Sequence, residues 1–157
     1  MVAEPITIRE AVLDDVPFLR KMMWEAISAS PTLMTRLGDE TIQRRETAYW
    51  DGWLIRPDPA FLSVDLNGRV AGAIVLQPDN GEGPGWRIGI GVEADVRGHG
   101  IGTRLIERAL AFARAGGATY VNLSVDPVNT RAVALYHRLG FAETGAQNGM
   151  VLMRKVV

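Results

Sequence analysis

The chain has 157 residues, a formal net charge of −1 at pH 7 and no cysteine. These values exclude disulfide bonds and thiolate chemistry, and they give no general attraction to nucleic acid or to an anionic membrane. Two histidines are too few for a typical zinc site, so we expect no metal. The length suits a single domain over residues 1–157. No apolar run is long enough to span a bilayer and residues 1–5 do not resemble a signal peptide, which predicts a cytoplasmic protein.

The N-terminal half of the chain predicts a strand, two helices and a β-hairpin. Asp14 or Asp15 is placed to cap the first helix, and Pro31 interrupts the apolar pattern that follows. Asn67-Gly68 lies between two apolar runs, which is a strong signal for a tight hairpin turn. The predicted elements of this half include residues 6–9, 18–27, 39–53, 61–66 and 69–76.

The C-terminal half predicts an alternation of strands and helices. Residues 78–85 are predicted as a mobile loop, and Gly116-Gly117 ends the helix that begins at Ile101. Three sequential strands followed by alternating helices and strands fit a single mixed α/β sheet. The predicted elements of this half are strands at 86–92, 119–125 and 151–156 and helices at 101–115 and 130–139.

A glycine-rich loop, residues 97–103, follows one predicted strand and opens the next helix. The first N–H groups of a helix have no internal partner, and no side chain here is placed to cap them, so they stay free for an anion such as a diphosphate. Thr103-Arg104 excludes a Walker loop, which needs a Lys before Ser or Thr at that point. Residues 89–94 fit a dinucleotide-binding fingerprint by letter, but no helix can begin inside them, so we interpret that match as chance.

Two separate blocks resemble the GNAT superfamily of N-acetyltransferases. The first is Arg97-x-x-Gly100-x-Gly102, which is similar to the acetyl-CoA signature Arg/Gln-x-x-Gly-x-Gly/Ala. The second is similar to the family block Asn-x-x-Ala-x-x-Leu-Tyr-x-x-x-Gly-Phe, through Asn129, Ala132, Leu135, Tyr136, Gly140 and Phe141. Residues 6–15 also look like the opening strand and helix of the family. The resemblance covers nearly the whole chain and is weakest between residues 30 and 59.

The resemblance implies an α/β (α+β) fold, with one mixed, mainly antiparallel sheet flanked by helices and a splayed central strand pair that forms the acetyl-CoA cleft. It implies acetyl-CoA as co-substrate and a backbone N–H near Val92 as the donor to the thioester oxygen. Arg97 has a simpler alternative as a solvated loop residue, and Asn129 as a helix N-cap. The implied cofactor contacts are Ile90, Gly91, Val92, Arg97, Gly98, His99, Gly100, Ile101, Gly102, Thr103 and Asn129.

Tyr136 resembles the general acid that protonates the departing thiolate, and its alternative is a packed helix aromatic. Its ordinary pKa of about 10 keeps it protonated at neutral pH. The general base stays unassigned. Ser124 stands where some relatives that acetylate protein N-termini carry a Glu, while Glu93 and Asp126 are nearby carboxylates that we expect to be solvated.

We therefore expect an acetyl-CoA-dependent N-acetyltransferase that transfers the acetyl group directly, in a ternary complex, to a primary amine of a small molecule. Trp24, Trp50 and Trp53 lie in the segment from which the family builds its acceptor pocket, although aromatics at helical spacing are more often core residues. Two alternatives stay open: a non-catalytic acyl-CoA-binding or sensor module, and a protein or peptide N-acetyltransferase. We expect no nucleic-acid or membrane partner, and a homodimer remains open.

Overall fold

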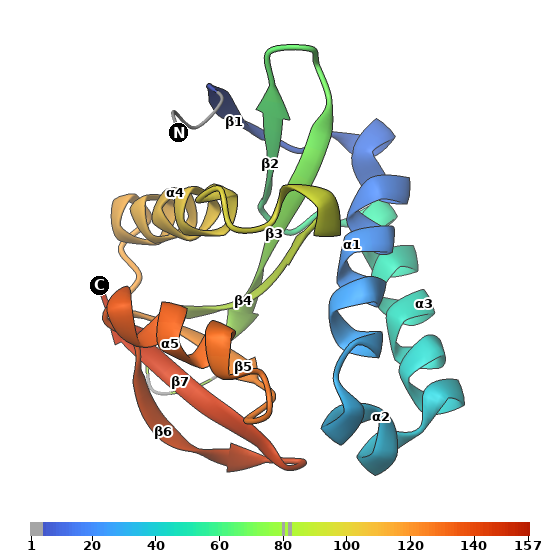
Figure 1. Ribbon diagram of the computed structural model, residues 1–157, viewed down its shortest axis with the longest axis vertical. Coiled ribbons are helices and arrows are strands. Elements are labelled where there is room, and N and C mark those ends of the chain that lie inside the picture. Colours follow the sequence, from blue (N-terminus) through green and yellow to red (C-terminus); the bar gives the residue numbers. More distant parts are fainter. Residues whose placement is uncertain (1–4, 80, 82) are drawn as a thin grey trace.

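A computed structural model of the chain describes residues 5–79, 81 and 83–157 (Figure 1). The strands are β1 (Ile6–Glu10), β2 (Ala60–Asp65), β3 (Val70–Asp79), β4 (Gly85–Val92), β5 (Tyr120–Val125), β6 (Ala142–Gln147) and β7 (Met150–Val156). The helices are α1 (Val16–Ser28), α2 (Pro31–Leu37), α3 (Asp39–Ile55), α4 (Ile101–Ala115) and α5 (Thr130–Arg138). No helix among the described residues is long and apolar enough to cross a membrane.

The strands form one seven-stranded sheet in the order β1-β2-β3-β4-β5-β7-β6. Neighbouring strands are antiparallel except for the central pair, β4 and β5, which is parallel. The helices lie in two layers, with α4 and α5 on one side of the sheet and α1 to α3 on the other (Figure 1). This architecture confirms the predicted mixed, mainly antiparallel sheet flanked by helices.

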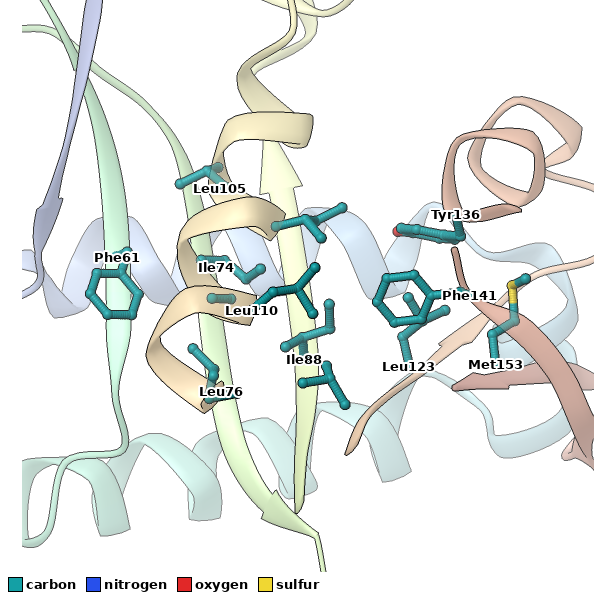
Figure 2. Close-up of a cluster of buried hydrophobic side chains, with 14 of the residues drawn as sticks. Phe61, Ile74, Leu76, Ile88, Leu105, Leu110, Leu123, Tyr136, Phe141 and Met153 are labelled. Atoms are coloured by element: carbon teal, nitrogen blue, oxygen red, sulfur yellow. The ribbon is translucent and has the colours of Figure 1, made fainter. Parts of the chain in front are cut away.

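Each helical layer has its own apolar core. The larger core joins α4 and α5 to the central strands, and Figure 2 shows Leu105 and Leu110 of α4 beside Ile74 and Ile88 of the sheet. The smaller core joins α1 and α3 to β2 and β3 through residues that include Leu19 and the indoles of Trp50 and Trp53. Trp50 and Trp53 are 1% and 3% exposed, so both indoles pack in this core.

The central strand pair splays apart. β4 and β5 pair only at Gly85, Trp86 and Arg87, opposite Tyr120 to Asn122. Beyond Arg87, β4 continues as far as Val92 with no ladder to β5, while it stays paired with β3 along its whole length. The expected splayed pair is therefore confirmed, and it leaves one edge of β4 unpaired next to the glycine-rich loop.

The structure contains two elements that the periodicity did not predict. Pro31 begins helix α2 rather than only interrupting a helix, because Pro is favoured in the first turn and Ser30 accepts a hydrogen bond from the Leu33 N–H as its N-cap. Strand β6 pairs with β7, but all of its residues are exposed, so it has no apolar alternation to reveal it.

Two local predictions need correction. The Asp15 side chain makes no cap hydrogen bond to α1; it accepts instead from the Val12 N–H and from Arg9, whose Nη1 lies 2.8 Å from Asp15 Oδ2. The loop predicted over 78–85 is shorter, because Pro78 and Asp79 belong to β3 and Gly85 to β4. Residues 80 and 82 of that prediction lie outside the described residues.

Candidate active site

The unpaired edge of β4 carries backbone groups that face away from β3. In an antiparallel pair, alternate residues direct both backbone groups at the same neighbour. The Glu93 N–H donates to the Ala71 carbonyl of β3 at 2.8 Å. The backbone groups of odd-numbered residues therefore face β3, and those of even-numbered residues face away from it. The N–H groups of Ile90 and Val92 therefore face the splay. A backbone donor for a thioester oxygen, expected near Val92, has these two candidates.

Gly89 and Gly91 lie on the face of β4 that packs against α1. A Cβ at Gly91 would lie 2.8 Å from the Met22 carbonyl oxygen, and one at Gly89 would lie 3.1 Å from the Met23 sulfur. The two glycines thus let α1 approach the strand closely. This packing accounts for the two glycines. Both lie within a strand rather than in a phosphate loop, so their match to a dinucleotide fingerprint is a chance one.

The glycine-rich loop ends in an uncapped helix start. Gly100 is the N-cap of α4 in a left-handed conformation with φ of +83°, and no side chain caps the helix. The first recorded backbone bond of the helix runs from Arg104 N–H to the Gly100 carbonyl, which leaves the amides of Ile101, Gly102 and Thr103 without an intrahelical acceptor. A Cβ at Gly100 would meet no atom of the described residues within 4 Å. The loop is therefore suited to hold an anion on backbone N–H groups.

Arg97 and His99 both bond to the backbone around this loop. Arg97 Nε donates to the Val92 carbonyl at 2.9 Å, and His99 Nδ1 lies 3.1 Å from the Val96 carbonyl. The Arg97 contact ties the loop to the last residue of β4 while the side chain stays exposed, and a contact with the cofactor stays a prediction. Ile101 is 7% exposed and packs in the larger core, so any contact it makes with a ligand comes from its backbone.

Tyr136 lies on α5 at the edge of the larger core. Its ring packs against Phe141 with centroids 6.0 Å apart, and it shares a cluster with Ile101 against which Ile90 and Val92 also pack. Figure 2 shows the ring pointing from α5 toward β4 and α4. No hydrogen bond of the Tyr136 hydroxyl is recorded with any described residue. Burial raises the pKa of Tyr136 above its ordinary value, so the group is protonated at neutral pH.

Asn129 fills the N-cap role that was left open for it. Its side-chain oxygen accepts a hydrogen bond from the Ala132 N–H at 3.2 Å, which fixes the start of the helix that carries Tyr136. The capping contact uses the oxygen of the amide group, and the nitrogen keeps its donor capacity. A contact between Asn129 and a cofactor stays a prediction.

The two carboxylates near the site are both engaged. Glu93 accepts from Lys21 Nζ at 2.6 Å, so it is held in an ion pair between the end of β4 and α1. Asp126 is 5% exposed, which corrects the expectation of a solvated group. It accepts from the Ser30 hydroxyl at 2.7 Å and the Thr32 hydroxyl at 2.9 Å, and also from two backbone N–H groups. Sequence reasoning missed the contacts with Ser30 and Thr32 because these residues lie more than 90 positions from Asp126.

Two hollows of the described surface are lined by none of the predicted cofactor or catalytic residues, although each includes one of the tryptophans expected near an acceptor pocket. The larger, about 480 Å³, lies between the β1–α1 connection and Trp53, and the smaller, about 260 Å³, lies between α1 and α3 beside Trp24. Among the described residues no cluster of His, Asp and Glu is arranged to hold a metal ion. The predicted residues on β4, the loop and α4 are contiguous, and Tyr136 joins them through the larger core.

The splayed sheet beside an uncapped, glycine-rich helix start agrees with the family comparison. Residues 20–141 match the model of the acetyltransferase (GNAT) family. The chain belongs to this family, which confirms the resemblance found in the sequence and makes the chain an acetyltransferase domain.

Individual relatives cover different shares of the chain. An uncharacterised N-acetyltransferase of Methanocaldococcus jannaschii is 26% identical over 95% of this chain and 66% of its own length. The mycothiol acetyltransferase of Thermobispora bispora is 35% identical over 65% of this chain. Among solved structures, yncA of Salmonella typhimurium with its cofactor acetyl-CoA has a TM-score of 0.73 and 22% identity, over 98% of this chain and 94% of that one. The chain spans about two thirds of the first relative and 35% of the second.

Proposed function

We propose that this protein is an acetyl-CoA-dependent N-acetyltransferase that acts on a primary amine of a small molecule, by direct transfer in a ternary complex. The observation that carries the proposal is the edge of β4 that is unpaired beyond Arg87 and leads through the glycine-rich loop to the uncapped start of α4. This edge offers backbone N–H groups for an extended, amide-bearing arm, and the loop offers them for a diphosphate. We also propose that residues 1–157 act as one domain in the cytoplasm, and we leave a homodimer open.

The proposed reaction needs one group to stabilise charge and one to supply a proton. The amine nitrogen bonds to the thioester carbon, and the backbone N–H of Ile90 or Val92 stabilises the resulting oxyanion. When the carbon–sulfur bond breaks, the Tyr136 hydroxyl gives its proton to the thiolate. Burial raises the pKa of Tyr136, which weakens it as an acid, but the same apolar surroundings also raise the pKa of a thiol next to it. The proton lost by the amine passes to solvent, because Glu93 and Asp126 are already engaged, and solvent returns a proton to the Tyr136 oxygen once CoA has left.

The test measures the release of free CoA in the presence of a panel of small amines. A thiol-specific reagent detects the CoA. The chain contains no cysteine, so every thiol detected belongs to the product. Amine-dependent release supports the proposal. Tight acetyl-CoA binding without release for any small amine or peptide favours the acyl-CoA sensor, and release with peptides alone favours a protein or peptide N-acetyltransferase.

A further inference from the structure

Two arginines and an asparagine form a row across three neighbouring strands. Arg87 of β4 lies opposite Asn122 of β5, which in turn lies opposite Arg154 of β7. Residues directly opposite each other in a sheet point to the same face. Since neighbouring strands are about 4.8 Å apart, the two arginines start roughly 10 Å from each other, with the asparagine between them. Long guanidinium side chains from these positions can converge on one group.

The row faces away from α4 and α5. Its chain neighbours Trp86, Ile88, Val121 and Leu123 all pack with the larger core, so the alternate residues point to the opposite face. On that opposite face the smaller core covers β2 and β3 with α1 and α3, and the row lies beyond it on β4, β5 and β7. Figure 1 shows α1 and α3 beside the β2–β4 part of the sheet, while α2 lies near the turn between β6 and β7. Arg87 and Arg154 are both only half-buried, so solvent reaches them.

Arg154 is held in place before any ligand arrives. Its Nε donates to Asn122 Oδ1 at 2.8 Å, and its guanidinium lies 4.0 Å from the centre of the Tyr120 ring. Asn122 Nδ2 in turn donates to Asp79 Oδ2 at 3.1 Å, and the Tyr120 hydroxyl donates to the same oxygen at 2.7 Å. Asp79 offsets one positive charge, so the cluster keeps a net charge of +1. A guanidinium fixed in this way loses little freedom when it binds an anion.

The row lies at the point where β4 and β5 separate. Arg87 is the last residue of β4 that pairs with β5, and Ile90 lies three residues further along the unpaired edge, roughly 10 Å away. An amine that reaches a thioester beside Ile90 from this face has its other end next to the row. The distance suits a small molecule in which a few carbon atoms separate the amine from a second polar group.

We propose that Arg87 and Arg154 bind a carboxylate of the acceptor, so that the preferred substrates are primary amines that carry an acid group about six carbon atoms from the amine. This inference rests on the proposed N-acetyltransferase function and names its substrate class. Guanidinium groups bind carboxylates and phosphates through paired hydrogen bonds, and asparagine between them adds no competing charge.

The experiment compares 6-aminohexanoate with hexylamine, in which a methyl group replaces the carboxylate. We expect the wild type to show a KM for aminohexanoate about 10- to 100-fold below that for hexylamine, as for hydrogen bonds to a charged group. Arg87→Gln should collapse this ratio toward one. Arg45→Gln, at an exposed arginine of α3, should leave the ratio unchanged. An aminohexyl phosphate tests whether phosphate replaces the carboxylate; a KM below that for aminohexanoate would overturn the carboxylate assignment.

Different results would contradict the carboxylate subsite formed by Arg87 and Arg154 and the proposed acetyltransferase function. Equal KM values for both amines in the wild type, with no change in Arg87→Gln, would overturn the subsite while acetyl transfer stands. If no amine is acetylated, the proposed function fails, and calorimetric binding of aminohexanoate still decides the subsite: loss of binding in Arg87→Gln supports it and equal binding overturns it. Should Arg87→Gln fail to fold, Arg154→Lys, which keeps the charge but loses the planar contact with Tyr120, must weaken the same preference.

Discussion

The Ser30 hydroxyl donates a 2.7 Å hydrogen bond to Asp126 Oδ2, joining two residues 96 positions apart. The same carboxylate accepts from the Thr32 hydroxyl and N–H and from the Val128 N–H. Ser30 is also the N-cap of α2. The contact therefore attaches the turn between α1 and α2 to the end of β5, directly before the loop that leads to Asn129 and the helix carrying Tyr136.

Asp126→Asn should destabilise the fold. An amide has one acceptor oxygen where the carboxylate has two, so it cannot satisfy all four donors, and a buried unsatisfied group costs about 1–3 kcal/mol. Urea denaturation at neutral pH should show a loss of this size. Asp51→Asn, at an exposed position of α3, should change the free energy of unfolding by less than about 0.5 kcal/mol. Equal stability of the two variants would show that the Asp126 contact contributes nothing.

The stability contributed by Asp126 should depend on pH. Burial raises the pKa of Asp126, but the hydrogen bonds from Ser30, Val128 and Thr32 outweigh burial and hold the pKa below its ordinary value. A carboxylate with a lowered pKa in the folded state stabilises the fold above its unfolded pKa, about 3.9, and loses that contribution as the pH falls through the folded value. The stability difference between wild type and Asp126→Asn should thus be full at pH 7 and shrink below about pH 4. A difference that is constant with pH, or grows in acid, would contradict this assignment.

The glycine-rich loop can be tested by substitution at Gly102. The residue lies in the first turn of α4, where a Cβ would have only the Ile90 side-chain tip within 4 Å, at 3.9 Å. Asp is tolerated at a helix start and adds negative charge beside the expected diphosphate. Gly102→Asp should therefore keep its own melting temperature but lose the rise in Tm that acetyl-CoA gives the wild type.

The matched comparison for this loop is Gly102→Ala, which adds the Cβ without the charge and should keep most of the acetyl-CoA shift. Gly100→Val is a poorer probe, because the positive φ of Gly100 strains any β-branched residue whatever the ligand does. An unchanged acetyl-CoA shift in Gly102→Asp would remove the loop from the cofactor site.

The sequence predicted the elements whose residues carry both a pattern and a boundary signal. The hairpin at Asn67-Gly68, the uncapped start of α4 and the N-cap at Asn129 all follow from local chemistry, and all are present. Ser30-Pro31 carried an equally local signal for α2, a capping residue followed by Pro in the first turn, but a helix of 7 residues is too short for its apolar spacing to stand out.

Features that depend on distant partners could not be predicted in this way. Nothing in the sequence distinguishes Asp126 from a solvated loop carboxylate, because its contact with Ser30 forms only in the folded chain. The row of Arg87, Asn122 and Arg154 likewise depends on the register of three strands. Gly91 is a similar case, because only the approach of α1 shows why a side chain is excluded there.

Gly91→Ala should destabilise the fold by about 1–3 kcal/mol, because the added Cβ would lie 2.8 Å from the Met22 carbonyl oxygen, a backbone atom that moves only if α1 shifts. Gly52→Ala is the control: Gly52 lies within α3, a Cβ there meets nothing within 4 Å, and alanine should stabilise the helix by up to about 1 kcal/mol. Chemical denaturation measures both. If Gly91→Ala were as stable as Gly52→Ala, close packing of α1 on β4 would not explain this glycine.

Tyr136→Phe should lower kcat by about 10²- to 10⁴-fold, the usual contribution of a general acid, while acetyl-CoA affinity changes little. The ring keeps its contact with Phe141, and only the hydroxyl, which has no recorded partner among the described residues, is lost. Single-turnover rates separate the chemical step from product release, and calorimetry measures the affinity. If the chemical step ran at the wild-type rate, Tyr136 would be a packing residue of the larger core. Slow turnover with equally weakened acetyl-CoA binding would instead mean that the substitution disturbed the cofactor site, so the assignment of Tyr136 as general acid requires kcat to fall alone.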